Sequence, residues 1–188
     1  MQHTIIALVE DKPGVLNRIV SLFRKRNFNI DSLTVSKTQT PGLSRMTITL
    51  DNTQVNVGRM IVYLEKLINV LKVEDLTYTP MVCRDLALIK VGTTAQNRSE
   101  IMQLVETFRA RVVDVAADSL VIEITGGNDK IQSFVEMMQT YGIQEFARSG
   151  AVGMARGRSG MTTANQTASQ NAKATQEVVT PEPALVTQ

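Results

Sequence analysis

The sequence lacks most of the residues from which catalytic and metal sites are built. Its 188 residues include one cysteine (Cys83), one histidine (His3) and no tryptophan. A single cysteine cannot form an internal disulfide framework and suits a reducing compartment, so we expect a cytoplasmic protein. His3 and Cys83 are too isolated in the sequence for a metal site or a nucleophile pair. No cluster of serine, histidine or paired carboxylates replaces them, and we therefore expect no catalytic site and no metal site.

Aromatic residues, an excess of one charge and long apolar runs are also scarce. Aromatics make up 4% of the chain, and 20 basic against 18 acidic residues give a net charge of +2. A sheet that binds RNA carries stacking aromatics on its central strands, and "RMTITL" (residues 45–50) carries none. The N-terminal apolar run in "HTIIALVED" is too short, and too soon ended by charge, for a signal peptide or a membrane span. We expect neither nucleic acid nor a membrane as a partner.

The chain does contain two kinds of apolar spacing, which alternate along it. "TIIALV" is short, apolar and rich in β-branched residues, as in a buried strand. After it the apolar spacing becomes helical, in one stripe of Val15, Leu16, Ile19, Val20 and Phe23. "RMTITL" returns to the alternation of a strand. The expected order is strand, helix, strand, strand, helix and strand, at residues 4–9, 15–25, 29–37, 45–50, 57–68 and 70–78.

The same order recurs in the second half of the chain. Its strands and helices are expected at residues 85–91, 101–108, 111–116, 119–125, 131–138 and 142–150. Each half matches the split βαβ arrangement, in which both helices cover one face of a four-stranded antiparallel sheet. We therefore predict an α+β protein of two tandem ferredoxin-like (βαββαβ) domains, at residues 1–79 and 80–157.

The last segment, residues 158–188, differs from both halves. It is polar, rich in small residues and aperiodic. Such a segment buries too little apolar surface to offset the entropy of ordering a chain, so we expect a disordered tail.

The strand-to-helix junction "EDKPGV" (residues 10–15) has the composition of an anion site. A helix N-terminus presents unpaired N–H groups and the positive end of the helix dipole, and proline fits its first turn. Gly14 has no side chain, so an anion can approach the N–H groups of Gly14, Val15 and Leu16. The alternative is a tight connection that binds nothing, and local chemistry alone favours it because most such loops bind no ligand.

The longer stretch around this junction is more specific. "LVEDKPGVLNRIVSLFRKRNFNIDSLTVSKT" (residues 8–38), followed by "LSRMTITL", closely resembles the ACT domain of the small, regulatory subunit of acetolactate synthase (acetohydroxyacid synthase). The second half carries the marks of the same family in "ALIKV", "RVVDV" and "EFARSGAVGMARG". The resemblance covers residues 1–157, and the tail falls outside it.

This resemblance implies a branched-chain amino acid, usually valine, bound at an interface between two ACT domains. Gly14, Val15 and Leu16 would hold its carboxylate, and Asn29 of the facing chain its polar head. The family often has asparagine at the position of Asp11, where a carboxylate can hold the ligand's ammonium group but repels its carboxylate. The expected effector site consists of Asp11, Gly14, Val15, Leu16, Asn29 and Ile30.

The resemblance also implies a function and partners. The chain would bind the large catalytic subunit of acetolactate synthase, raise its activity, and confer feedback inhibition in the biosynthesis of valine, leucine and isoleucine. It would form a homodimer through its ACT domains. Thiamine diphosphate, Mg²⁺ and FAD would belong to the catalytic partner, and this chain would bind no cofactor.

Two alternatives stay open. One is a stand-alone ACT-domain amino-acid sensor without an enzyme partner, and the other is a ferredoxin-like enzyme or RNA-binding module. Co-purification with a larger thiamine-dependent subunit separates the first alternative from the regulatory subunit. Intrinsic activity or retention of RNA would support the second.

Overall fold

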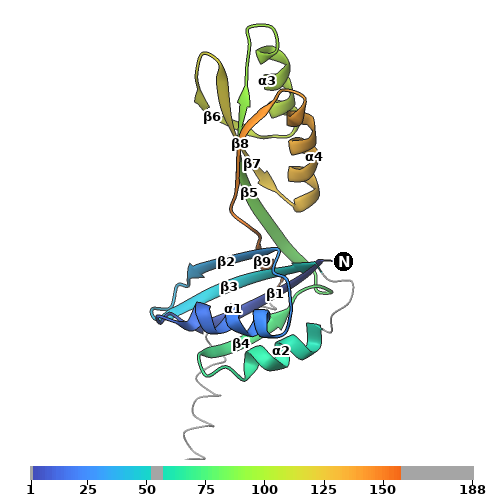
Figure 1. Cartoon of the computed structure of the whole chain (residues 1–188). Helices are drawn as coiled ribbons and strands as arrows, with labels where there is room; N and C mark the ends of the chain where they lie inside the picture. The colour runs from blue at the N-terminus through green and yellow to red at the C-terminus, as the bar shows by residue number, and fades with distance from the viewer. Residues whose placement is uncertain (1, 52–56, 158–188) are drawn as a thin grey trace, which may run out of the picture.

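Two antiparallel sheets, one in each half of the chain, organise the part of the protein that the structure describes (Figure 1). The computed structural model describes residues 2–51 and 57–157. The predicted α+β fold of two tandem βαββαβ units is confirmed. Residues 158–188, where the sequence predicts a disordered tail, lie outside the described residues.

The first sheet has the strand order β2-β3-β1-β4 and carries both helices of its half on one face. Its elements are β1 (Gln2–Glu10), α1 (Val15–Lys25), β2 (Ser32–Lys37), β3 (Leu43–Asp51), α2 (Val57–Glu65) and β4 (Val70–Asp75). Alternate residues of β1, such as Ile5 and Val9, face the helices, and α1 meets them with Val15, Ile19 and Phe23. The strand period of two and the helix period of 3.6 therefore point their apolar residues into one core.

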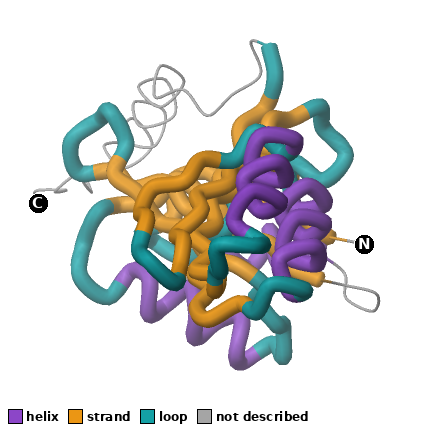
Figure 2. Tube along the Cα trace, turned by 90° about the horizontal axis from the view of Figure 1, so that it is seen from above, coloured by secondary structure: helices purple, strands orange, loops and turns teal. Residues whose placement is uncertain are grey.

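The second sheet repeats this plan with the order β6-β7-β5-β8. Its elements are β5 (Met81–Gly92), α3 (Arg98–Thr107), β6 (Arg111–Val115), β7 (Ser119–Gly126), α4 (Asn128–Gln139) and β8 (Ile143–Arg148). Ile89, Ile122 and Phe134 are fully buried in its core. Figures 1 and 2 show that the two helix pairs lie on different sides of the molecule.

A ribbon of two strands, which the apolar spacing did not predict, joins the halves. The strand expected at residues 85–91 begins earlier, at Met81, and its first residues pair with a further strand, β9 (Val152–Ala155). In Figure 1 this part of β5 runs down from the upper sheet to the lower one. We call the paired segments Met81–Arg84 and Val152–Ala155 the β5–β9 ribbon.

The β5–β9 ribbon covers the face of the first sheet that the helices leave open. A Cβ atom added at Gly153 would lie 3.4 Å from the Thr4 methyl and 3.8 Å from Ile6 Cδ1. The Arg45 guanidinium also donates a hydrogen bond of 2.8 Å to the Gly153 carbonyl. Both Thr4 and Ile6 are buried although they point away from the helices. The first sheet is thus packed on both faces.

The described helices do not include a membrane span. Across residues 2–51 and 57–157, no helix is both long enough and apolar enough to cross a bilayer.

Candidate functional site

The junction between β1 and α1 is a tight loop that ends in a left-handed residue. Asp11 N–H donates to the Gly42 carbonyl at 2.8 Å, and Lys12 N–H donates to the Glu10 carbonyl at 3.0 Å. Gly14 is the N-cap of α1, with φ 83° and ψ −10°. A Cβ atom at Gly14 would meet no described atom within 4 Å. Glycine is therefore favoured here by the backbone conformation rather than by lack of space.

The N-terminus of α1 is open and carries no negative charge of its own. This fully described helix has no acidic residue in its first turn and no side-chain cap. Val15 N–H donates to the Lys12 carbonyl at 3.3 Å, a long bond, so the loop itself uses one of the three N–H groups expected to hold a carboxylate. The Val15 side chain is buried in the first core, whereas Leu16 is 43% exposed beside the open helix end. The site can accept an anion because unpaired N–H groups and the helix dipole favour negative charge.

Asp11 lies at the mouth of this loop and has a basic neighbour. Its carboxylate is exposed and lies 3.7 Å from the ammonium group of Lys37, at the end of β2. Lys37 offsets part of the negative charge that Asp11 places near the helix N-terminus. Sequence reasoning did not select Lys37, because the two residues become neighbours only when β2 is paired in the sheet.

Asn69 holds the loop in place from the far side. Its backbone carbonyl accepts a hydrogen bond of 2.9 Å from Glu10 N–H, and its amide side chain donates to the Glu10 carboxylate. The Arg18 guanidinium of α1 donates to the other end of the same amide at 2.6 Å. The hydrogen bond from Asn69, and then the neighbouring Lys12, lower the pKa of Glu10. Asn69 thus ties the end of β1 to α1 across the candidate site.

Asn29 and Ile30 lie at the opposite end of α1. Asn29 is exposed, and Ile30 is half-buried against the first core. Ser32, which starts β2, pairs with Thr49, and Thr49 pairs with Thr4 near the start of β1, whereas the loop leaves the far end of β1. From Thr4 to Glu10 an extended strand rises about 20 Å. One chain therefore brings Asp11, Gly14, Val15 and Leu16 together but cannot add its own Asn29 to them.

Comparison with known proteins defines the class and then the family. The sequence family described as "AHAS small subunit-like ACT domain" matches residues 5–72, which makes the first half an ACT domain. The family described as "Small subunit of acetolactate synthase" matches residues 84–157. The chain belongs to the acetolactate synthase small-subunit family.

The matches to individual relatives cover nearly the whole described chain. The probable acetolactate synthase small subunit of Archaeoglobus fulgidus is 50% identical over 157 residues, which are 84% of this chain and 98% of that protein. The small subunit of Bacillus subtilis is 44% identical and covers 90% of this chain and 99% of its own length. The crystal structure of the small subunit from Thermotoga maritima superposes with a TM-score of 0.77 at 37% identity, over 85% of this chain and 99% of that one.

Proposed function

We propose that this chain is the regulatory subunit of acetolactate synthase in the biosynthesis of branched-chain amino acids. It binds the large catalytic subunit, raises its activity and confers feedback inhibition by valine or a related amino acid. The relatives named as small subunits support a role beside a larger partner. The observation that carries the effector proposal is the open N-terminus of α1 behind the left-handed Gly14.

In this proposal the amino acid is held by complementary charge. The N–H groups at the start of α1, those of Gly14 and Leu16 above all, receive the ligand carboxylate. The ammonium group lies toward Asp11, whose repulsion of the ligand carboxylate is reduced by the nearby Lys37.

The site is completed by a second copy of the chain. Asn29 of that copy meets the polar head of the ligand, and its Ile30 lines the pocket, since the register of the sheet keeps both away from Gly14 within one chain. A dimer with two-fold symmetry forms two such sites.

The surface next to the site supports dimer formation. Leu16 and Val20 lie one helical turn apart on α1 and are 43% and 39% exposed, and Val35 on the edge strand β2 is 41% exposed. An edge strand with exposed apolar neighbours is a ready surface for pairing with another chain. We propose that this surface of α1 and β2 forms the homodimer interface.

The chemistry of the synthase would remain with the large subunit. Thiamine diphosphate, Mg²⁺ and FAD are expected there, and this chain is proposed to bind none of them and to act through contact alone.

The test is an assay of the large subunit with and without the full chain, across a titration with L-valine. We expect higher activity when the chain is added, and a fall in that activity as valine rises. A size-exclusion profile of the mixture should show the two subunits eluting together. Unchanged activity despite co-elution, or separate elution of the two subunits, would contradict the proposal.

A further inference from the structure

Strand β2 carries the hydroxyl groups of Ser32, Thr34 and Ser36 on the face opposite the helices. Its residues alternate, so Leu33 packs against the first core while Ser32 and Thr34 point to the other side. The Ser32 hydroxyl lies 2.6 Å from the Thr49 hydroxyl of β3. Ser32 follows Ile30 by two residues and Asn29 by three, so this end of β2 is continuous with the proposed effector contact.

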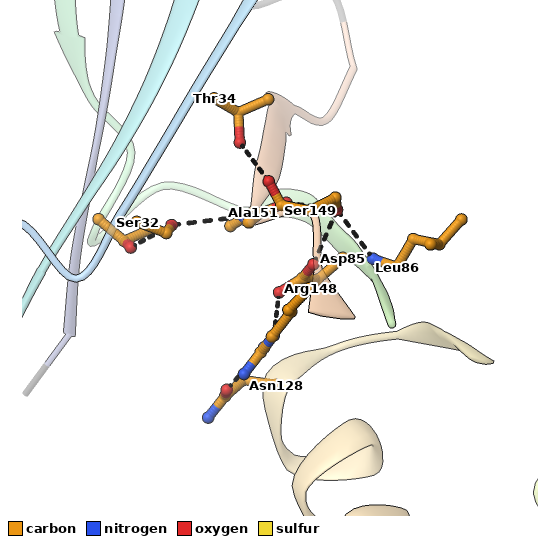
Figure 3. Close-up of polar contacts among 10 residues, drawn as sticks. Ser32, Thr34, Asp85, Leu86, Asn128, Arg148, Ser149 and Ala151 are labelled. Carbon is orange, nitrogen blue, oxygen red and sulfur yellow. Dashed lines mark hydrogen bonds and ion pairs between the residues drawn. The ribbon is translucent and has the colours of Figure 1, made fainter. Parts of the chain in front are cut away.

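The segment Ser149–Ala151, between β8 and β9, lies directly on the hydroxyl groups of Ser32 and Thr34 (Figure 3). Thr34 donates to the Ser149 carbonyl at 3.5 Å, and Ala151 N–H donates to the Ser32 hydroxyl at 3.4 Å. Both distances are at the long end for hydrogen bonds, so each bond is weak and can be lengthened or broken at little cost.

Gly150, at the centre of this segment, is suited to the contact in two ways. Its φ is +85°, a conformation that side chains rarely adopt, and an added Cβ atom would lie 3.0 Å from Thr34 Oγ1 and 3.3 Å from Ser32 Cβ. The other left-handed glycines of the described chain differ from it, because a Cβ atom at Gly14, Gly42, Gly142 or Gly157 would meet nothing within 4 Å. Gly150 is thus the left-handed glycine at which any side chain would press on β2.

On its other side the same segment is firmly attached to the second half. Ser149 N–H donates to the Leu86 carbonyl at 2.9 Å, and the Ser149 hydroxyl donates to the buried carboxylate of Asp85 at 2.9 Å. Arg148 pairs with the same carboxylate and also donates to the Asn128 side chain, at the start of α4, at 2.9 Å (Figure 3). A shift of Ser149 would therefore pass to β5 and α4 through short, charge-assisted bonds.

Space for such a shift exists beside the contact. A cavity of about 340 Å³ opens between the two halves, and Leu33, Thr49, Cys83, Gly126 and Gly150 are among the residues that line it. The segment Ser149–Ala151 is therefore weakly bonded to β2, strongly bonded to β5 and next to open space. It can take more than one position relative to β2 while it stays attached to the second half.

We propose that the contact of Ser149–Ala151 with Ser32 and Thr34 transmits effector binding from the ACT domain to the second half. An amino acid that binds to Asn29 and Ile30 moves the start of β2, and Gly150 allows the segment Ser149–Ala151 to follow that movement closely. This inference rests on the proposed function, because it describes how the effector site of that proposal reaches the rest of the chain.

The test compares Gly150→Ala with Gly142→Ala in the full chain assembled with the large subunit. Both variants place alanine at a left-handed position, and only Gly150→Ala adds a methyl group against β2. Thr34→Val is a third variant, which removes the hydrogen bond to Ser149 without changing the backbone. For each variant we would measure L-valine binding by calorimetry, activation of the large subunit without valine, and inhibition at saturating valine.

We expect Gly150→Ala to bind valine and to activate, but to lose most of the inhibition, a drop of about fivefold or more in the response. Thr34→Val should bind valine and activate too, and should lose a smaller part of the inhibition because it removes one weak bond. Gly142→Ala should respond as the unmodified chain does. If Gly150→Ala does not fold, Thr34→Val decides alone. Full inhibition in Gly150→Ala and Thr34→Val, or equal loss in Gly142→Ala, would overturn the inference while leaving the proposed function intact. If the unmodified chain itself neither activates nor responds to valine, the proposed function fails, and this inference fails with it.

Discussion

Substitution of Gly14 by aspartate or by asparagine separates charge from backbone strain at the proposed carboxylate site. Gly14 has φ 83°, so any other residue there is strained. Asparagine and aspartate occupy this left-handed region more readily than other residues, and we expect both variants to lose no more than the roughly 1–2 kcal/mol that this conformation costs an L-residue. The two side chains have nearly the same shape, and an added Cβ atom meets no described atom within 4 Å. The pair therefore differs mainly by one negative charge.

The size of the effect follows from the distance between the charges. Two carboxylates about 4 Å apart repel by about 4 kcal/mol at an effective dielectric constant of about 20. Gly14 is exposed, so water and salt screen this repulsion. If only a third of it survives, about 1.4 kcal/mol, valine affinity falls about tenfold.

The assay has three parts. Circular dichroism checks that both variants fold, calorimetry gives the dissociation constant for L-valine, and the activity of the large subunit gives the inhibition curve. We expect Gly14→Asp to activate the large subunit and to need about ten times more valine for the same inhibition, while Gly14→Asn keeps most of the response. Equal valine affinity in the two folded variants would show that no carboxylate binds beside Gly14.

Three further predictions concern stability and the proposed partner contact. Phe134→Ala should lower the free energy of unfolding of the second half by about 3–5 kcal/mol, seen as a lower denaturant midpoint, because the ring is fully buried in its core; a loss of unfolding free energy below about 1 kcal/mol would contradict that packing. Asn69→Ala should raise the pKa of Glu10 toward its ordinary value, since the hydrogen bond from Asn69 is the largest cause of its lowering. Stability from Glu10 is present above its unfolded pKa and lost as pH falls through the folded value, so the difference in stability between this variant and the unmodified chain should be largest at neutral pH. It should shrink in acid to what the lost hydrogen bond from Arg18 contributes. An NMR titration of the carboxyl checks the shift, and an unchanged pKa would refute the assigned cause. Deleting residues 158–188 should leave activation and valine inhibition unchanged in the large-subunit assay, and loss of either would show that their composition was misinterpreted.

The local spacing of apolar residues was enough to predict the two βαββαβ units. For α1, however, the predicted stripe of apolar residues includes more residues than one chain buries in its core. The structure buries Val15, Ile19 and Phe23 but leaves Leu16 and Val20 on the same helix partly exposed. Spacing shows which residues are apolar on one side of a helix, and not whether the same chain covers all of them. Leu16 and Val20, the exposed part of the stripe, belong to the surface that we assign to the dimer interface.

The β5–β9 ribbon could not be predicted from spacing. "AVGMARG" is short, contains two glycines and shows no clear alternation. The strand exists because Val152–Ala155 pairs with Met81–Arg84 and because Gly153 fits closely on the first sheet. Both causes lie far away in the sequence, so no local pattern signals them. The predicted division between residues 79 and 80 stays a prediction, since the ribbon packs residues of the second half on the first sheet.

The proposed site was only partly predictable for the same reason. The loop composition pointed to the start of α1, and it left open whether Gly14 would be helical or left-handed. Nothing around Asn69 in "LINVL" indicates that its amide joins Glu10 to Arg18, because those contacts depend on how the turn before β4 meets the end of β1.

The central claim is that each effector site takes the start of α1 from one chain and Asn29 from another. A mixed dimer tests it most directly, with one chain carrying Gly14→Asp and its partner carrying Asn29→Ala. Each variant alone forms a dimer in which both sites are damaged. In the mixed dimer the two changes fall in the same site, and the other site contains an intact Gly14 and an intact Asn29. The measurement is the number of L-valine molecules bound per dimer by calorimetry, after the mixed dimer is isolated through a different affinity tag on each chain. We predict that either variant alone binds valine weakly or not at all and that the mixed dimer binds one valine with the affinity of the unmodified protein. A mixed dimer that binds no better than the two variants alone would contradict a site shared between chains.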